Sequence, residues 1–251
     1  MNAQDVFVPY GPTHWAALAV AVLGTAAVTV LGRRLRGTRG EIVFSRLFAS
    51  VLAAYALAML VYRWLPGSFD VHVGLPIHLS DVAWMVAVIA LALGSQWAFA
   101  LTYYWGLTLN PQAMLTPALD APDFPHIDFI DLWVQHILVL WAAVYLTWGR
   151  GCRVDWRGYR LTLVVTMAWA CVTFGLNSAL GTNYGFLNGK PNNPSVLDVF
   201  GPWPWYLLVE FLIISGVWAL ITWPWTVRWR TDGAWDQQRI CLAPRTPRPD
   251  I

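Results

Sequence analysis

The sequence predicts an all-α protein, a polytopic bundle of about seven transmembrane helices with the amino terminus outside and the carboxyl terminus cytoplasmic. Of its 251 residues, 57% are hydrophobic and only 12% are charged, whereas soluble domains carry about a quarter charged residues. The 17 tryptophans agree with this interpretation, because indole rings favour the interface between membrane and water. Together these observations favour the bilayer as the solvent of the chain and exclude an ordinary soluble domain.

Seven apolar stretches approach or exceed the length of a transmembrane helix, which needs about 20 mostly apolar residues. They follow one another without a large soluble insertion. We therefore expect a single transmembrane domain over residues 1–225 and a disordered cytoplasmic tail over residues 226–251. The expected spans are 14–31, 42–65, 75–93, 96–109, 129–148, 159–180 and 204–225.

Several of these spans begin or end at a recognisable signal. A run of arginines from Arg33 to Arg39 follows the first span at once. Pro76 is expected in the first turn of the third span, because its fixed φ suits that position. The fourth span is short and is expected to stop at Asn110-Pro111, and Gly181 is expected to close the sixth.

The basic residues predict the orientation, because cytoplasmic loops are enriched in Lys and Arg. When the loop after the first span is placed inside, only Arg63 and Lys190 fall outside the cytoplasmic boundary. Moving any one span to the other side would break this pattern. We therefore expect a multi-pass protein of the cytoplasmic membrane, and the near-absence of lysine hints at a GC-rich bacterial genome.

Two long loops, 110–128 and 181–203, lie on the expected outer side. The second reads GTNYGFLNGKPNNPSVLDVFGPW, which is dense in Gly, Asn and Pro but keeps apolar residues such as Tyr184 and Leu197. A loop with this much apolar surface is expected to pack on something. Either it is a lid, since long loops are often functional, or it is a structured connector.

Ionisable and polar residues gather at one depth on the outer side, and such residues inside a membrane often mark functional sites. From a rise of about 1.5 Å per residue, Asp81, His136 and Glu210 are each expected roughly 7–10 Å below the outer end of a different span. Ser80 and Asn177 fall near the same level. Polar groups that merely stabilise a core need not share a level.

Helical spacing adds information about direction. Asp128, Asp131 and Gln135 share one face of the fifth span, with His136 beside them. In the third span, His78 shares a face with Asp81, while Ser80 points about 200° away from His78. A base for Ser80 is therefore expected from another helix, and His136 is the best candidate.

Each of these residues also has a structural explanation. Ser80 in a membrane helix usually bonds a backbone carbonyl or a neighbouring helix. His136 alone would more often be a buried histidine with satisfied partners, and Glu210 a protonated structural residue. Lys190, in a Gly-Lys-Pro turn, either contacts a phosphate or headgroup or only shapes the turn.

Four segments resemble known membrane proteins. They are LPIHLSDVA (75–83), WVQHILVLWAAVYLTW (133–148), LNSALGTNYGFLNGKP (176–191) and VLDVFGPWPWYLLVE (196–210). They resemble the YwaF-like bacterial integral membrane proteins and, more remotely, the animal transmembrane protein 164 family. The likeness covers about residues 40–225, and its most specific parts are the GTNYxFLxxKP string and the Gln-His before an apolar run.

This resemblance implies phospholipid acyl transfer, since the animal relatives look like acyltransferases that remodel ether lipids with an essential cysteine and histidine. The histidine corresponds to His136. The cysteine of bacterial relatives corresponds to Ser80, and that of the animal relatives to Ile77, so this chain has no cysteine at either place. Either Ser80 replaces the thiol as nucleophile, or this member has lost acyl transfer.

A serine nucleophile needs an adjacent base, and the base needs an orienting group. His136 is the expected base, Asp131 or Glu210 its orienting carboxylate, and the amino end of the third span the site for an oxyanion or a phosphate. An outward-facing site has no ready acyl-coenzyme A. The expected activity is thus a lipid acyltransferase or transacylase, or a lipid hydrolase, with membrane phospholipids as partners.

Other residues of the layer are expected to bind substrate, and other functions stay open. The expected substrate-binding residues are His78, Asp81, Asn177, Asn183, Tyr184 and Lys190. No cofactor and no nucleic-acid partner are expected. The alternatives are a transporter using the threonines of the sixth span, a metal-dependent hydrolase using His78, Asp81, Asp131 and His136, although the common zinc spacings are absent, and a scaffold without chemistry.

Overall fold

The structure, a computed structural model, describes residues 6–67, 69–191 and 195–232 and is helical almost throughout. The only β pairing in these residues is an isolated bridge between Val6 and Pro122. The elements are α1 (Pro12–Leu35), α2 (Arg39–Arg63), α3 (Leu79–Leu93), α4 (Gln96–Tyr104), η1 (Trp105–Leu109), α5 (Asn110–Leu115), α6 (Ile127–Val144), η2 (Tyr145–Gly149), α7 (Trp156–Leu180), η3 (Tyr184–Phe186), η4 (Val196–Phe200) and α8 (Trp205–Asp232).

These elements form seven helical segments, because α4, η1 and α5 run on as one segment, as do α6 and η2. Five segments are long and apolar enough to cross a membrane, namely α1, α2, α6 with η2, α7 and α8, and α3 is a shorter apolar helix. The predicted all-α transmembrane bundle is therefore confirmed.

Three predicted boundaries were wrong. The third helix begins at Leu79 instead of Leu75, so Pro76 lies in the preceding turn, and His78 caps the helix with its backbone N–H bonded to Asp81 Oδ2 at 3.0 Å. The fourth helix does not stop at Asn110-Pro111. The wide turn η1 changes the hydrogen-bond register just before Pro111, so its missing N–H falls near the start of a new α segment, where it costs little.

The third boundary concerns the expected tail, because α8 continues to Asp232, past Trp225. The remainder of the predicted disordered tail, residues 233–251, lies outside the described residues.

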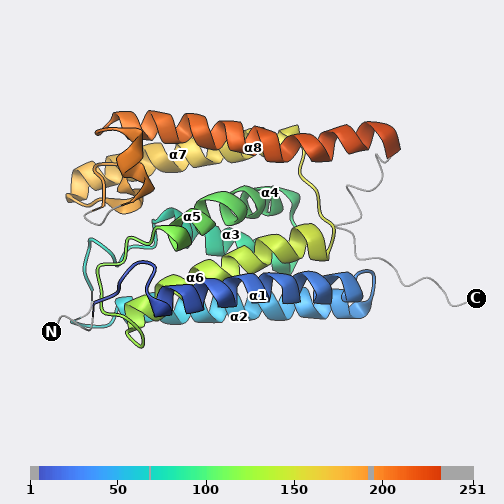
Figure 1. The fold of residues 1–251 in the computed structure, drawn as a ribbon, viewed down its shortest axis with the longest axis horizontal. Coiled ribbons are helices and arrows are strands. Elements are labelled where there is room, and N and C mark those ends of the chain that lie inside the picture. The colour runs from blue at the N-terminus through green and yellow to red at the C-terminus, as the bar shows by residue number, and fades with distance from the viewer. Residues whose placement is uncertain (1–5, 68, 192–194, 233–251) are drawn as a thin grey trace, which may run out of the picture.

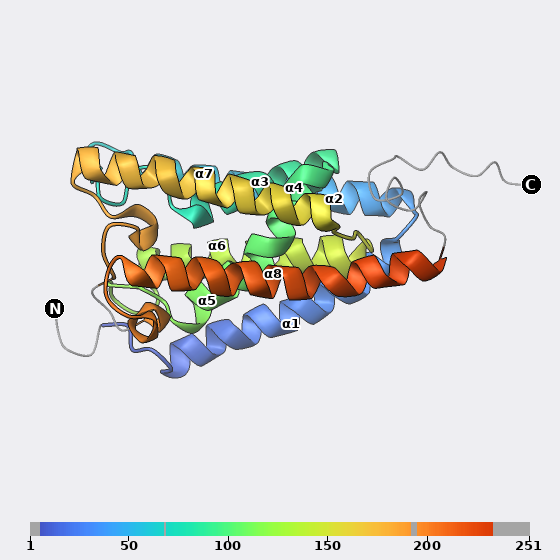
Figure 2. The same ribbon diagram turned by 90° about the horizontal axis from the view of Figure 1, so that it is seen from above.

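The helices form layers (Figure 1). Helices α7 and α8 lie on one side and α1 and α2 on the other, with α3 to α6 between them. Contacts join α2 to α3, α3 to α4, α1 to α6 and α4 to α7. The view from above shows α7 and α8 running along the length of the bundle (Figure 2). Small residues permit these close approaches, and Gly32 of α1 lies directly against Gly149 of η2.

The α7–α8 layer is bonded to the core at both ends: Trp169 of α7 donates to the Ile77 carbonyl at 3.0 Å at the end where α3 starts, and a second set of bonds lies toward the opposite end. In that second set the Tyr104 and Thr222 hydroxyls are 2.6 Å apart, and Trp218 donates to Thr108 Oγ1 at 2.9 Å. In the second half of α7 most side chains, such as Val172 and Leu180, are nevertheless exposed. Exposed apolar side chains on membrane helices face lipid, so this half of the layer offers its surface to the bilayer.

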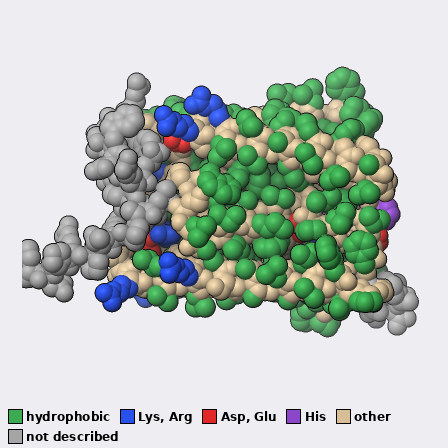
Figure 3. All heavy atoms as spheres, turned by 180° about the vertical axis from the view of Figure 1, so that it is seen from behind, with side chains coloured by type: hydrophobic (Ala, Val, Ile, Leu, Met, Phe, Trp, Pro, Cys, Tyr) green, Lys and Arg blue, Asp and Glu red, His purple; other side chains and the backbone are tan. Residues whose placement is uncertain are grey.

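The two ends of the bundle differ in charge, and we call them the basic end and the acidic end. Lys and Arg side chains gather at one end, and a His side chain lies at the other (Figure 3). The basic end carries Arg33 to Arg39 and Arg150 to Arg160, and the acidic end carries the ionisable residues considered below. The gathering of Lys and Arg at one end is the feature from which the sequence predicts that this end faces the cytoplasm.

Candidate functional site

Near the acidic end, one arginine contacts two carboxylates from two other helices. Arg63, the last residue of α2, donates from Nη2 to Asp131 Oδ2 on α6. Its Nη1 lies 3.8 Å from Asp81 Oδ1 on α3. The Asp81 and Asp131 side chains are only 5% and 9% exposed, and that of Arg63 is 32% exposed. We call these three residues the Arg63 cluster; it joins three helices and sets two carboxyl groups against one guanidinium.

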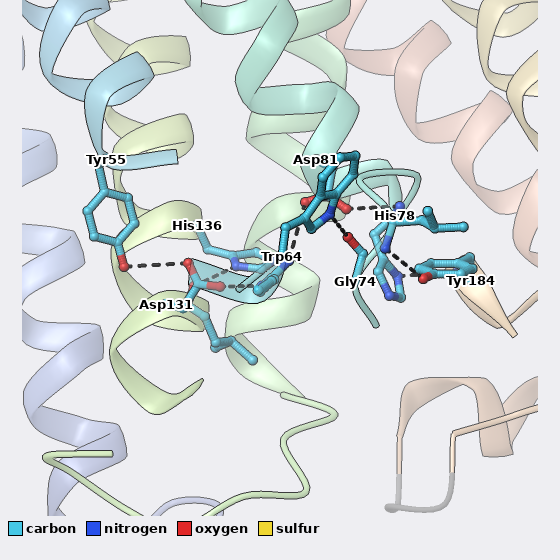
Figure 4. A network of polar contacts seen from close by, with 12 residues as sticks. Tyr55, Trp64, Gly74, His78, Asp81, Asp131, His136 and Tyr184 are labelled. Atoms are coloured by element: carbon cyan, nitrogen blue, oxygen red, sulfur yellow. Dashed lines mark hydrogen bonds and ion pairs between the residues drawn. The ribbon is translucent and has the colours of Figure 1, made fainter. Parts of the chain in front are cut away.

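Other side chains lie within hydrogen-bonding distance of the two carboxylates (Figure 4). The Tyr55 hydroxyl lies 3.5 Å from Asp131 Oδ1, and the Gln135 side chain lies beside Asp81. A small opening beside the cluster has polar walls formed by Arg63, Asp81, Asp131 and Gln135 and apolar walls that include Trp84 and Leu60. The carboxylates are thus buried but remain next to a cavity.

His136 is buried in α6 with a defined tautomer. Its Nδ1 lies 2.6 Å from the carbonyl oxygen of Leu132, and because a carbonyl only accepts, Nδ1 must carry the proton. Nε2 therefore holds the lone pair and can act as a base. The group that orients the ring is thus a backbone carbonyl, whereas Asp131 or Glu210 was predicted. Asp131 still interacts electrostatically with His136.

The first turn of α3 lies close to this histidine. His78 interacts electrostatically with His136, accepts the backbone N–H of Gly185 at Nδ1 over 3.4 Å, and packs edge-on against the Tyr184 ring. Ser80, the second residue of α3, is partly buried. Within the described residues Ser80 and His136 share no hydrogen bond. The structure therefore places the predicted nucleophile and base on neighbouring elements without joining them.

The segment 182–190 forms a strap over this turn. Tyr184, fully buried, donates its hydroxyl to the Val71 carbonyl at 2.6 Å and accepts the Leu75 N–H at 2.9 Å. Asn177 bonds the backbone of Tyr184 through both amide atoms, and Asn183 accepts the Asn188 N–H. These three residues, predicted to bind substrate, use their polar atoms to build the strap, which resembles a structured connector more than an open lid.

Lys190 and Glu210 lie further along the same loop and on α8. Lys190 pairs with Asp198 at 3.3 Å and lies over the Tyr206 ring. The Ser195 N–H and then Lys190 hold the pKa of the exposed Asp198 carboxyl below its ordinary value. Glu210 is partly buried one turn beyond Tyr206, and in the described part of the chain no bond links it to the Arg63 cluster.

The residues proposed for the alternative functions are also placed. The threonines of α7 are used locally: Thr162 donates to the Gly158 carbonyl, and Thr166 donates to the Thr162 carbonyl and accepts from Trp105. Among the residues that the structure describes, no three His, Cys, Asp or Glu side chains converge as metal ligands would. Neither the polar pathway nor the metal site gains support from this geometry.

The sequence analysis missed Arg63, Tyr55 and the bonding role of Gln135. The signal for Arg63 was available, because it was one of two basic residues on the wrong side of the predicted topology. A charge in that position is costly unless it has a partner, and Asp81 and Asp131 were both already expected on the outer half of their spans.

A family model described as the TMEM164 family matches residues 9–222. The chain belongs to the TMEM164 family. The predicted remote resemblance is therefore confirmed, and membership agrees with the multi-pass membrane helices of the structure. No curated protein and no solved structure matches the chain.

Proposed function

We propose that this TMEM164-family chain is a membrane-embedded enzyme that moves an acyl chain from a membrane phospholipid to a lysolipid or to water. The observation that carries the proposal is the state of His136. Its Nδ1 proton is fixed on a backbone carbonyl, which leaves the Nε2 lone pair as a base on α6, a helix that packs against the Ser80 helix α3. A general base needs a free lone pair that comes within hydrogen-bond reach of the proton it removes when substrate is bound.

In the proposed reaction, Nε2 of His136 takes the proton of the Ser80 hydroxyl as Oγ bonds to the acyl carbonyl carbon. The ester C–O bond then breaks, and the departing lysolipid oxygen receives that proton from His136. A second lysolipid hydroxyl or a water molecule attacks the acyl-serine, again losing its proton to His136, and Ser80 Oγ regains a proton as it leaves. Apo structures often lack the catalytic hydrogen bond, which forms once substrate is bound.

Two further features support acyl chemistry at this place. The first turn of α3 has backbone N–H groups without helical partners, and these can stabilise the oxyanion that develops on the carbonyl. The neighbouring helix α2 carries exposed apolar side chains, such as Leu57 and Val61, which suit the approach of a lipid substrate. An expected outward orientation leaves a membrane lipid as the accessible acyl donor.

The test is an acyl-exchange assay in vesicles. The purified protein would be reconstituted with a phospholipid that carries a deuterated acyl chain and with an unlabelled lysophospholipid, and the products followed by mass spectrometry. We expect deuterated acyl chains on the lysophospholipid or as free acid. Replacement of His136 by Gln or of Ser80 by Ala should lower the rate about 10²–10⁴-fold.

His126→Gln is the matched control, because His126 lies at the same end but pairs with the exposed Asp128 at 3.4 Å. Its rate should equal that of the native protein. Absence of transfer by the native protein above a heat-inactivated sample would overturn the proposal. Unchanged transfer by Ser80→Ala would show that serine is not the nucleophile.

A further inference from the structure

We infer that Arg63 is a positioning residue, which fixes the distance between the Ser80 turn of α3 and the His136 helix α6 through one carboxylate on each. The inference rests on the proposed function, since it concerns how its two reacting groups are held. Arg63 itself comes from a third helix, α2, and within the described residues it donates no hydrogen bond to Ser80 or His136.

On the α3 side, holding Asp81 means holding the turn that carries Ser80. Asp81 follows Ser80 directly in the chain, and its Oδ2 accepts the backbone N–H of His78 at 3.0 Å. The carboxylate therefore closes the first turn around Ser80. Its other oxygen, Oδ1, faces Arg63 at 3.8 Å, so any shift of the turn changes the ion pair.

On the α6 side, Asp131 connects α2 to the segment before His136. Oδ2 accepts from Arg63 and Oδ1 faces the Tyr55 hydroxyl, so both oxygens point to α2. Asp131 precedes His136 by five residues, about one and a half turns, and interacts with it electrostatically. Gln135, beside Asp81, adds a second link between α6 and α3.

The chemistry of arginine suits this task. A guanidinium has a planar fork of donors that can face two carboxylates at once, whereas a lysine ammonium is a single point of charge on a flexible stem. The rest of the α2–α3 interface is apolar, with Leu52, Ala56 and Ala87 buried. Arg63→Lys should therefore keep the charge and the packing but loosen the separation between the two helices.

The experiment compares Arg63→Lys with Arg150→Lys, a matched change in a partly buried arginine that pairs with Glu41 at the basic end. Four quantities are measured: the thermal unfolding temperature, kcat and KM in the vesicle exchange assay, and the rate at which an alkyl fluorophosphonate labels Ser80. A misplacement of about 1 Å can cost about 10²-fold in rate. We expect Arg63→Lys to lower kcat and labelling by about 10–100-fold, with KM within about twofold and an unfolding temperature like that of Arg150→Lys.

The outcomes separate this inference from the function on which it rests. If the native protein neither transfers acyl chains nor is labelled, the proposed function fails. If the native protein reacts and Arg63→Lys reacts equally fast, the function stands and the positioning role is wrong. A rise in KM with kcat and the labelling rate unchanged would also overturn the positioning role.

If Arg63→Lys does not fold, Asp131→Asn provides the second variant, because it removes one half of the link and keeps Arg63 paired with Asp81. The same fall in kcat and labelling, without a change in KM, is expected. Native rates in a folded Asp131→Asn protein would contradict the inference.

Discussion

The two ends of the bundle solve the same problem in different ways, because each holds an arginine–carboxylate contact between helices. At the basic end, Glu41 accepts from Arg150 at 2.8 Å and from the Gly37 N–H at 2.6 Å, one anion with one cation. At the acidic end, Arg63 faces both Asp81 and Asp131. The first arrangement balances its charges, and the second leaves one carboxylate in excess.

This difference indicates different purposes. A balanced, fully hydrogen-bonded pair can hold two segments together, as Glu41 and Arg150 hold the start of α2 to the end of η2. A cluster with more carboxyl groups than cations costs free energy inside a membrane, and ionisable residues in such positions usually mark functional sites. The excess carboxylate therefore agrees with a site placed at the acidic end.

The strongest test of this contrast is Arg63→Gln, which leaves Asp81 and Asp131 buried together without a cation. Removing one partner of a buried ion pair costs about 3–5 kcal/mol of unfolding free energy. We expect a loss of this size, measured by reversible unfolding in bicelles. The triple variant Arg63→Gln, Asp81→Asn, Asp131→Asn should recover most of it, and a triple variant as unstable as the single one would contradict the electrostatic explanation.

Much of the fold followed from the sequence, because long apolar stretches have few alternatives in a bilayer. The seven helical segments were expected, and so was the proximity of His78 to Asp81, although His78 precedes α3 instead of lying on it. The start of α3 could not be derived from Pro76, because the helix begins after His78, whose N–H bonds the Asp81 carboxylate, and both signals occur within six residues.

The site was harder to predict from the sequence than the fold, because it depends on which helices become neighbours. The wide turn η1 carries the chain past Pro111 and allows Asn110 to bond the His136 carbonyl at 2.6 Å, which no periodicity reveals. Arg63 was noted only as an exception to a charge rule. Its partners are 18 and 68 residues away in the chain, and the sequence shows no such pairing.

A smaller loss is expected at the basic end. Glu41→Gln removes the anion of a balanced pair but can keep a hydrogen bond to Arg150 through its amide oxygen. Hydrogen bonds to charged groups contribute about 1.5–3 kcal/mol, so we expect a loss in this range from the same unfolding measurement. A loss equal to or larger than that of Arg63→Gln would remove the contrast between the two ends.

Tyrosine hydroxyls sharpen the comparison further. Tyr145 at the basic end lies 2.8 Å from the buried Ser45 hydroxyl, whereas Tyr55 at the acidic end is 3.5 Å from Asp131. We expect Tyr145→Phe to cost about 1 kcal/mol, since it leaves Ser45 without that partner, and Tyr55→Phe about 0.5 kcal/mol. Equal costs would show that Tyr55 bonds Asp131 more strongly than the distance indicates.

The smallest effect is expected where the acidic end meets water. Asp198 accepts the Ser195 N–H at 2.9 Å and pairs with Lys190, and these contacts hold its pKa below the ordinary value. Because the folded pKa is the lower one, the stabilisation is present above the unfolded pKa, about 3.9, and is lost as pH falls through the folded pKa. Amide hydrogen exchange of residues 195–201, corrected for the intrinsic rate, should be slower at pH 6 than at pH 3. Asp198→Asn should remove this dependence, because an amide does not titrate, and a native loop equally protected at both pH values would show that the carboxylate does not hold it.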